Sequence, residues 1–246
     1  NGLAGLVELY VCVDELFRSP HTQQAFSRYQ TRTLVEDALE GSIVLLDSCS
    51  ILKEVILRMK ENVKILQSAL RRKASDLTVV KQITAYLCFR KKIKSIIKGL
   101  RPLRGIEKKM SLYSFSDVDH HVLMVSQVLG EVNALTMSLF KTILGFLSAK
   151  SKASNGFQLL STFVLKSMST HETAKPFVNE VEAIDMATLS LHKSSHNHEM
   201  NDADVQMTLK NLQILDVCID GFDDGLNHLF RRLIQYRASI LNMAVC

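Results

Sequence analysis

The sequence predicts an all-α fold, an elongated antiparallel helical bundle with two or more very long helices. Only three prolines and ten glycines occur among 246 residues, which favours long helices over a sheet with many turns. Apolar residues recur at steps of three and four along most of the chain, whereas no alternating strand pattern recurs. With 47% hydrophobic and 22% charged residues, the chain can bury a sizeable core, and we expect a single domain over residues 1–246.

The first predicted helix covers residues 3–17 and ends at Ser19-Pro20, because the residue before a proline is pushed out of the helical region. A short helix over 22–29 follows. The next helix, over 31–72, keeps one apolar stripe, and at 1.5 Å per residue it would form a rod of about 60 Å.

The sequence "RRKASD" ends that helix, and Ser75 or Asp76 can cap the next one. This helix, over 77–110, should kink or split at 99–101 because Pro102 lies inside its periodicity. Its predicted apolar stripe opens with Leu77, Val80, Ile83 and Leu87.

A helix over 118–148, capped by Ser116 or Asp117, exposes few charges and is expected at the centre of the core. Its segment 132–149 is the best candidate for a membrane span. Lys141 interrupts that segment and the pattern is amphipathic from Val118 onward, so we interpret it as a buried core helix.

Three helices are expected in the last third: 157–168, 177–192 with Pro176 in its first turn, and 202–244 capped by Asp202 or Asp204. Gly221 and Gly225 either weaken the last helix or allow close helix contact. Mobile linkers are expected near 149–156, 169–176 and 193–203. The chain starts at Asn1 without an initiator Met, so we expect a native N-terminal segment to be missing.

The five cysteines form no CxxC pair and no dense disulfide framework. They are Cys12, Cys49, Cys88, Cys218 and Cys246. This scattered, odd-numbered set predicts a reduced intracellular compartment, the cytoplasm, with peripheral membrane association as an alternative.

Four blocks together resemble the plant BYPASS-like family. They are "LAGLVELYVCVDELFRSPHTQQAF", "LLDSCSILKEVILRMKENVKILQSALRRK", "AYLCFRKKIKSIIKGL" and "LFRRLIQYRASILNM". They occur in the order of the family and cover essentially the whole chain. The resemblance implies a plant-restricted helical protein linked to development and signalling, without established catalytic activity, and with a Ser- and Pro-rich segment before the first block. It carries over no catalytic residue.

Charge is unevenly distributed along the chain. Residues 64–109 hold fourteen basic and two acidic side chains, a net charge of +12. The flanking blocks, 1–63 and 110–246, carry −3 and −4. Such an asymmetry indicates either a contact surface or a solvated helix face.

The candidate binding site is a basic patch of nine side chains within this block. Its members are Arg90, Lys91, Lys92, Lys94, Lys98, Arg101, Arg104, Lys108 and Lys109. Three interpretations stay open: anionic lipid headgroups, an acidic partner protein, or a solvated face whose charges pair with neighbouring helices. Nucleic acid is disfavoured because aromatic residues are few and no binding motif is present.

Histidines offer a weaker candidate site. His192, His196 and His198 would bring ligands for Zn or Ni together if their segment were helical, although the surrounding Ser and Asn favour a loop. No GxSxG, GxGxxG or GxxxxGK[ST] motif occurs, so we predict no enzyme and no cofactor.

Two charged groups on the last helix complete the candidates. Asp216, Asp220, Asp223 and Asp224 form an acidic cluster that we expect against the basic middle helix or on a partner surface. Arg231, Arg232 and Arg237 are expected to complement the helix dipole near the C-terminus.

The sequence therefore predicts a non-catalytic plant regulatory or scaffold protein that acts through protein–protein binding. The main alternative is a peripheral membrane protein whose basic helix, around 90–109, binds anionic phospholipid. The third hypothesis is an enzyme or small-ligand binder with an interhelical pocket that the sequence does not locate.

Overall fold

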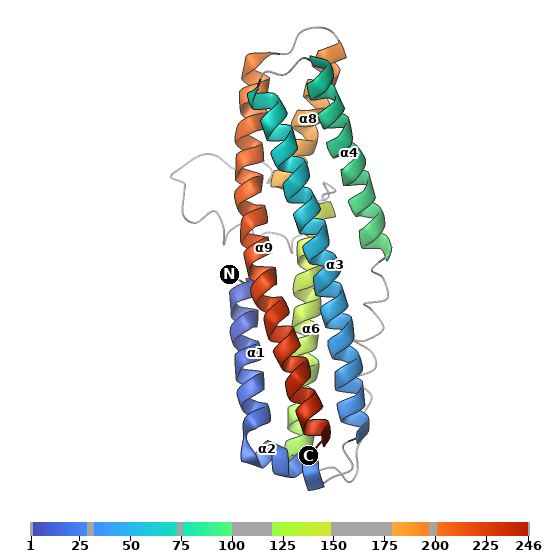
Figure 1. Cartoon of the computed structure of the whole chain (residues 1–246), viewed down its shortest axis with the longest axis vertical. Coiled ribbons are helices and arrows are strands. Elements are labelled where there is room, and N and C mark those ends of the chain that lie inside the picture. The colour runs from blue at the N-terminus through green and yellow to red at the C-terminus, as the bar shows by residue number, and fades with distance from the viewer. Residues whose placement is uncertain are drawn as a thin grey trace. The chain divides into compact units, whose positions relative to one another are not determined.

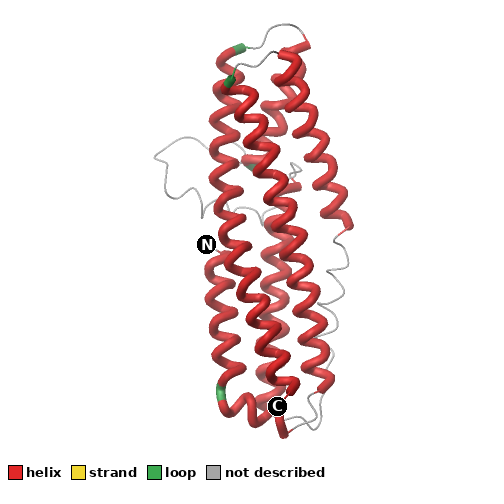
Figure 2. The backbone as a smooth tube through the Cα atoms, viewed as in Figure 1, coloured by secondary structure: helices red, strands yellow, loops and turns green. Residues whose placement is uncertain are grey.

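The computed structural model describes residues 2–28, 32–72, 76–99, 120–148, 179–196 and 201–245. Every regular element in these ranges is an α-helix, and no strand occurs within them (Figure 2). The predicted all-α class is confirmed. The elongated shape and the very long rods stay predictions.

The helices follow the predicted order closely (Figure 1). They are α1 (Gly2–Arg18), α2 (Pro20–Arg28), α3 (Arg32–Arg71), α4 (Asp76–Gly99), α6 (His120–Ser148), α8 (Glu180–His196) and α9 (Asp202–Val245). The predicted helix 157–168, the linkers 149–156 and 169–176, and the kink at Pro102 lie outside the described residues.

Polar side chains just before α2 and α9 set where these two helices begin. Ser19 Oγ accepts a bond of 3.2 Å from the Thr22 amide, so α2 begins at Pro20, two residues earlier than predicted. Asn201, rather than Asp202 or Asp204, caps α9, since its Oδ1 accepts the Ala203 amide at 3.0 Å.

The region around α8 differs from the prediction at both ends. Asn179 caps this helix by accepting the Val181 amide on Oδ1 at 2.8 Å, so α8 begins at Glu180 and not near Pro176. It then continues to His196, so the first part of the predicted linker 193–203 is helical.

The chain divides into two compact units, each of which takes part of α3, α6 and α9. The first unit comprises Asn1–Lys53, Gly99–Lys141 and Asp224–Cys246. The second comprises Glu54–Lys98 and Thr142–Asp223. The single-domain organisation stays a prediction.

Aromatic side chains form the centre of the first unit. The ring centroid of Tyr236 on α9 lies 5.2 Å from that of Tyr10 and 6.0 Å from that of Phe17, both on α1. The two hydroxyls have neutral partners on α6: Tyr10 pairs with Thr136 Oγ1 at 2.8 Å, and Tyr236 donates to Asn133 Oδ1 at 3.5 Å.

Two helices of the first unit, α1 and α9, are parallel. Gly225 of α9 lies against Leu3, and Ser239 donates to Asp14 at 2.5 Å, so α1 and α9 run in the same direction. A Cβ at Gly225 would lie 2.7 Å from Leu3 Cδ1, which confirms that this glycine allows close helix contact. Gly221, in the second unit, faces open space and has no such role.

The second unit packs the second part of α3 against α4, α8, the end of α6 and the first part of α9. Ile56, Met59, Ile83, Ile184 and Leu215 are fully buried in it. On its α3–α9 side, Lys60 Nζ lies 2.8 Å from Asp220 Oδ1 and 3.3 Å from Asp223 Oδ2.

Helix α6 is long and apolar enough to cross a membrane when judged by length and composition alone, with a mean hydropathy of 1.4 over its most apolar stretch. Of that stretch, 39% is buried. Val122, Phe140, Ile143 and Leu147 are among its buried side chains, which agrees with a core helix.

Candidate functional site

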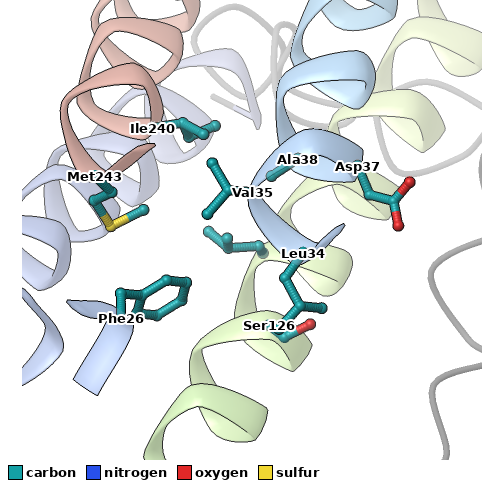
Figure 3. Close-up of a pocket in the computed structure, with 9 residues that line it drawn as sticks. Phe26, Leu34, Val35, Asp37, Ala38, Ser126, Ile240 and Met243 are labelled. Atoms are coloured by element: carbon teal, nitrogen blue, oxygen red, sulfur yellow. The ribbon is translucent and has the colours of Figure 1, made fainter. Parts of the chain in front are cut away.

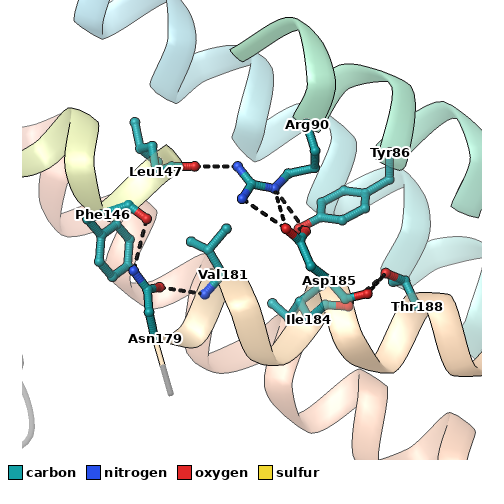
Figure 4. A network of polar contacts seen from close by, with 9 residues as sticks. All are labelled: Tyr86, Arg90, Phe146, Leu147, Asn179, Val181, Ile184, Asp185 and Thr188. Carbon is teal, nitrogen blue, oxygen red and sulfur yellow. Dashed lines mark hydrogen bonds and ion pairs between the residues drawn. The ribbon is translucent and has the colours of Figure 1, made fainter. Parts of the chain in front are cut away.

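Arg90, predicted as the first member of the exposed basic patch, is instead buried at 2% exposure (Figure 4). Its guanidinium binds the Asp185 carboxylate of α8 in a bidentate arrangement. Nε lies 2.9 Å from Oδ1, and Nη2 lies 3.0 Å from Oδ2. The planar fork of arginine matches a carboxylate in this way, so one solvent-facing cation of the prediction is used inside the fold.

Two further bonds complete this buried ion cluster of Tyr86, Arg90 and Asp185. The Tyr86 hydroxyl donates to Asp185 Oδ1 at 3.1 Å. Arg90 Nη1 donates to the Leu147 carbonyl in the last turn of α6. Burial, followed by the nearby Asp185 carboxylate, raises the pKa of Tyr86 well above its usual range. The hydroxyl therefore stays protonated and remains a donor.

Asn179 ties the end of α6 to the start of α8 beside this cluster (Figure 4). Its Nδ2 donates to the Phe146 carbonyl at 2.9 Å, while its Oδ1 accepts the Val181 amide. Phe146 also packs edge-on against Phe222 of α9, with ring centroids 5.3 Å apart. The last carbonyls of α6 are thereby satisfied by side chains from two other segments.

The chemistry of the ion cluster is structural. Its three side chains form hydrogen bonds with one another and with the end of α6. The Arg90 side chain is only 3% exposed. A buried ion pair must offset the cost of desolvating both charges, and good geometry with extra hydrogen bonds makes that possible. The cluster joins α4 to α6 and α8.

The core stripe of α4 explains why Arg90 is inside. The buried positions are Val79, Ile83, Tyr86, Arg90 and Ile93, at alternating steps of four and three. The predicted stripe of Leu77, Val80, Ile83 and Leu87 was wrong at Leu77, which is 69% exposed. A correct register would have placed an arginine in a core position and signalled a buried acidic partner.

The rest of the basic patch is only partly described. Lys91 and Lys92 are exposed, and neither forms an ion pair with another described residue. The side chains of Lys94 and Lys98 lie outside the described part of the chain, as do Arg101, Arg104, Lys108 and Lys109. The patch as a binding surface stays a prediction.

Among the described residues, the ion pairs of the acidic cluster on α9 are made with α3 and not with the basic helix. Asp220 and Asp223 pair with Lys60 of α3, and the hydrogen bond to Asp220 is the main cause that raises the pKa of Lys60. Asp216 carries a buried oxygen without a hydrogen-bond partner, and Asp224 is exposed in the first unit.

Arg237 does not act as a dipole-complementing residue at a helix end. Helix α9 continues to Val245, and Arg237 Nη1 donates to the Leu39 carbonyl and to Ser42 Oγ, both at 2.8 Å. Arg232 pairs with Gln235 one turn further along the same helix, at 2.8 Å. Arg237 thus fastens α9 to α3 within the first unit.

The histidine hypothesis gains no support from the described residues. Among them, no group of three or more His, Cys, Asp or Glu side chains can hold a metal ion. His198 and the side chain of His196 lie outside the described part, so that hypothesis stays untested. At the start of α6, His121 Nε2 lies 2.9 Å from Thr22 Oγ1 and its ring packs against His21.

In the first unit, a cavity of about 20 Å³ lies between Phe26, Leu34, Val35, Ile240 and Met243 (Figure 3). That volume has room for about one water molecule. It is too small for an organic ligand.

The groove of the second unit is larger, about 310 Å³, and lies between the end of α3 and the start of α9. Its lining is mixed in charge and comprises Leu70, Arg71, Asp202, Val205, Gln206, Leu209, Lys210 and Gln213. None of these eight is a Ser, Cys or His.

Large apolar side chains on the outside of the second unit were missed by the sequence analysis. Val217 of α9 and Leu77 of α4 are each 69% exposed, Met207 is 60% exposed and Met186 is 59% exposed. The periodicity of α9 was assigned to one inward stripe, so a second apolar face on the same helix went unnoticed.

Comparison with known proteins adds one finding. The family model described as Protein BPS1 matches residues 2–243, nearly the whole chain. The match confirms the resemblance carried by the four sequence blocks. No curated protein and no solved structure matches the chain.

Proposed function

Because the chain belongs to the BPS1 family, we propose that it is a non-catalytic regulatory or scaffold protein that acts by binding other proteins. Family membership indicates a plant protein that regulates development. The mode of action, protein binding without catalysis, is the proposal. An intracellular site of action belongs to the same proposal, because Cys12, Cys49, Cys88 and Cys218 are free thiols.

The observation that carries the proposal is the set of large apolar side chains on the outer faces of the second unit. Leu77, Met207 and Val217 are each at least 60% exposed, on two different helices. Exposed apolar surface of this kind marks interaction sites when it gathers into patches. The charged groups most deeply buried in that unit, in contrast, are used to hold helices together.

Reconstitution from purified proteins tests this proposal. Proteins captured from plant extract by the tagged chain are expressed separately and titrated against it by isothermal calorimetry. We expect at least one to bind with a dissociation constant near or below about 1 μM, which corresponds to about −8 kcal/mol. If every captured protein fails to bind in purified form, the scaffold function is wrong.

The peripheral membrane alternative keeps one observation in its favour. Lys91 and Lys92 are exposed, adjacent and without an ion pair to another described residue. Each basic side chain near an anionic bilayer contributes about 1 kcal/mol to binding. Liposome flotation with and without phosphoinositides tests this, with the Lys91→Glu/Lys92→Glu variant as comparison. Equal flotation of both proteins would remove these two lysines from the hypothesis.

A further inference from the structure

The outer face of α9 in the second unit has the spacing of a coiled-coil seam. Met207, Lys210, Ile214, Val217 and Gly221 follow one another at alternating steps of three and four residues. Met207 is 60% exposed, Ile214 40% and Val217 69%. We call these five positions the outward stripe. Apolar residues at this spacing form one continuous line along a helix, which is the pattern that packs against a second helix.

The outward stripe is additional to the face by which α9 joins the core. Leu209, Leu212, Leu215 and Ile219 are each at most 8% exposed and pack inside the second unit. A surface helix ordinarily has one apolar face and one polar face. Along this segment α9 is apolar on two faces, and only one of them is covered by the described part of the chain.

Gly221 leaves open space at one end of the outward stripe. A Cβ built at this position would meet no atom within 4 Å, in contrast to Gly225 one turn later. In knobs-into-holes packing, each knob of one helix enters a space between side chains of the other. The open space at Gly221, one turn after Val217, therefore leaves room for a large apolar side chain of an incoming helix.

Lys210 decides what kind of helix fits. It is the single charged residue of the outward stripe, it is exposed, and it has no ion pair with another described residue. A helix that covers the stripe must place an acidic group opposite this ammonium, because an unpaired charge in a covered seam is costly. A polar residue at one seam position also selects register and partner.

A second copy of the chain is a poor occupant for the same reason. Parallel pairing through the stripe would set Lys210 against its own equivalent, and antiparallel pairing centred on Ile214 would set it against Val217. Moving the centre to Met207 would bring Asp204 opposite Lys210 but would leave Val217 uncovered. The charge pattern thus selects against self-association and in favour of a different helix.

We propose that the outward stripe docks an amphipathic α-helix of a partner protein, with apolar side chains opposite Ile214 and Val217 and an Asp or Glu opposite Lys210. This inference rests on the proposed function and specifies the surface and the partner chemistry for it. It is a helix-on-helix mode of recognition, in which apolar anchors give affinity and one ion pair gives register.

A pair of designed peptides tests the inference on the whole chain. Both are amphipathic helices of about 21 residues, three heptads, with apolar seam positions. One central seam position is Glu in the first peptide and Lys in the second. Binding is followed by fluorescence anisotropy of the labelled peptide. The Glu peptide is expected to bind the wild-type chain at least tenfold more tightly, and Lys210→Glu should reverse that preference.

A matched pair of substitutions distinguishes binding at the outward stripe from non-specific hydrophobic binding. Val217→Lys should abolish binding of the Glu peptide, whereas Leu77→Lys should leave it unchanged, because both side chains are 69% exposed and only Val217 is in the stripe. Circular dichroism checks that both variants keep the wild-type helix content and melting point. Substitution at such exposed positions is expected to change stability little.

Several results would overturn the inference. The first is that neither peptide binds. The second is that both peptides bind equally well to the wild type and to Lys210→Glu. The third is that Leu77→Lys weakens binding as much as Val217→Lys. Light scattering that shows a dimer broken by Val217→Lys would make a second copy the occupant. If reconstituted partners bind the Val217→Lys variant as tightly as wild type, the stripe is wrong and the protein-binding function stands. If no partner reconstitutes, that function fails while the peptides still decide the stripe.

Discussion

The two units of this protein satisfy their buried polar groups in opposite ways. The second unit buries a charged pair, Arg90 with Asp185, and surrounds it with further hydrogen bonds. The first unit buries neutral hydroxyls, of which Tyr10 pairs with Thr136. A neutral hydrogen bond contributes about 1 kcal/mol net, whereas breaking a buried ion pair leaves an uncompensated charge. The second unit should therefore be far more sensitive to loss of one partner.

The largest expected effect is the loss of Asp185. Asp185→Ala leaves the Arg90 guanidinium buried without its carboxylate, and we expect the free energy of unfolding to fall by about 3–5 kcal/mol. Urea denaturation followed by circular dichroism measures it.

The control is the double variant Arg90→Met/Asp185→Leu, which removes both charges and should recover most of that loss. A double variant as unstable as Asp185→Ala would show that packing, rather than the uncompensated charge, causes the effect.

Alkaline pH should lower the stability of the first unit through its buried neutral thiol. Burial raises the pKa of Cys49, in the first unit, from 9.0 to about 12. Because the folded pKa lies above the unfolded one, the thiol contributes full stability below pH 9 and loses it progressively between pH 9 and 12. At 1.36 kcal/mol per pKa unit the loss is of the order of 4 kcal/mol at most. Comparing wild type with Cys49→Ala at pH 8 and pH 11 isolates it: the wild type should lose more stability, and equal losses would contradict the assignment.

Two glycines one turn apart should respond with opposite signs. Gly225→Ala forces a methyl group against Leu3, where Cδ1 is 2.7 Å and Cβ 3.0 Å away, so we expect a loss of about 1–3 kcal/mol. Gly221→Ala meets nothing within 4 Å and should stabilise the helix by up to about 1 kcal/mol. Thermal melts of both variants decide this. The same sign for both would mean that α1 does not pack on Gly225 as described.

The smallest expected effect is the loss of one neutral hydroxyl. In Tyr10→Phe, Thr136 still donates to the Val132 carbonyl at 2.7 Å, so no buried donor is left unpaired. We expect a loss of about 1 kcal/mol in urea denaturation. A loss as large as that of Asp185→Ala would erase the contrast between the units.

Most helices of this protein follow from local sequence patterns. The predicted ranges 3–17, 31–72, 118–148 and 202–244 agree with α1, α3, α6 and α9 within about two residues, because long apolar periodicity specifies both the element and its inward face. Caps were less predictable. Asn201 and Asn179 begin their helices, whereas neighbouring aspartates and Pro176 were expected, since several residues in a row can perform the same role.

The candidate sites depended more on tertiary contacts. The sequence identified the basic block, yet it could not tell that Arg90 differs from Lys91 and Lys92, its immediate neighbours. That distinction needs Asp185, which lies 95 positions away and is brought close only by packing of α4 against α8. The outward stripe was missed for a related reason. Apolar periodicity on α9 does not say which of two faces the other helices cover.

By itself, then, the sequence determined the all-α class, the order and approximate ends of the helices, the family and the uneven charge, because these depend on short-range patterns along one chain. The tertiary structure decided which charged residue is buried, that Lys60 takes the acidic side chains of α9, that Gly225 is a contact while Gly221 is not, and which apolar face stays outside. Each of those outcomes depends on contacts between segments that are distant in the sequence. Such a contact stabilises the fold only after the chain has brought both segments together.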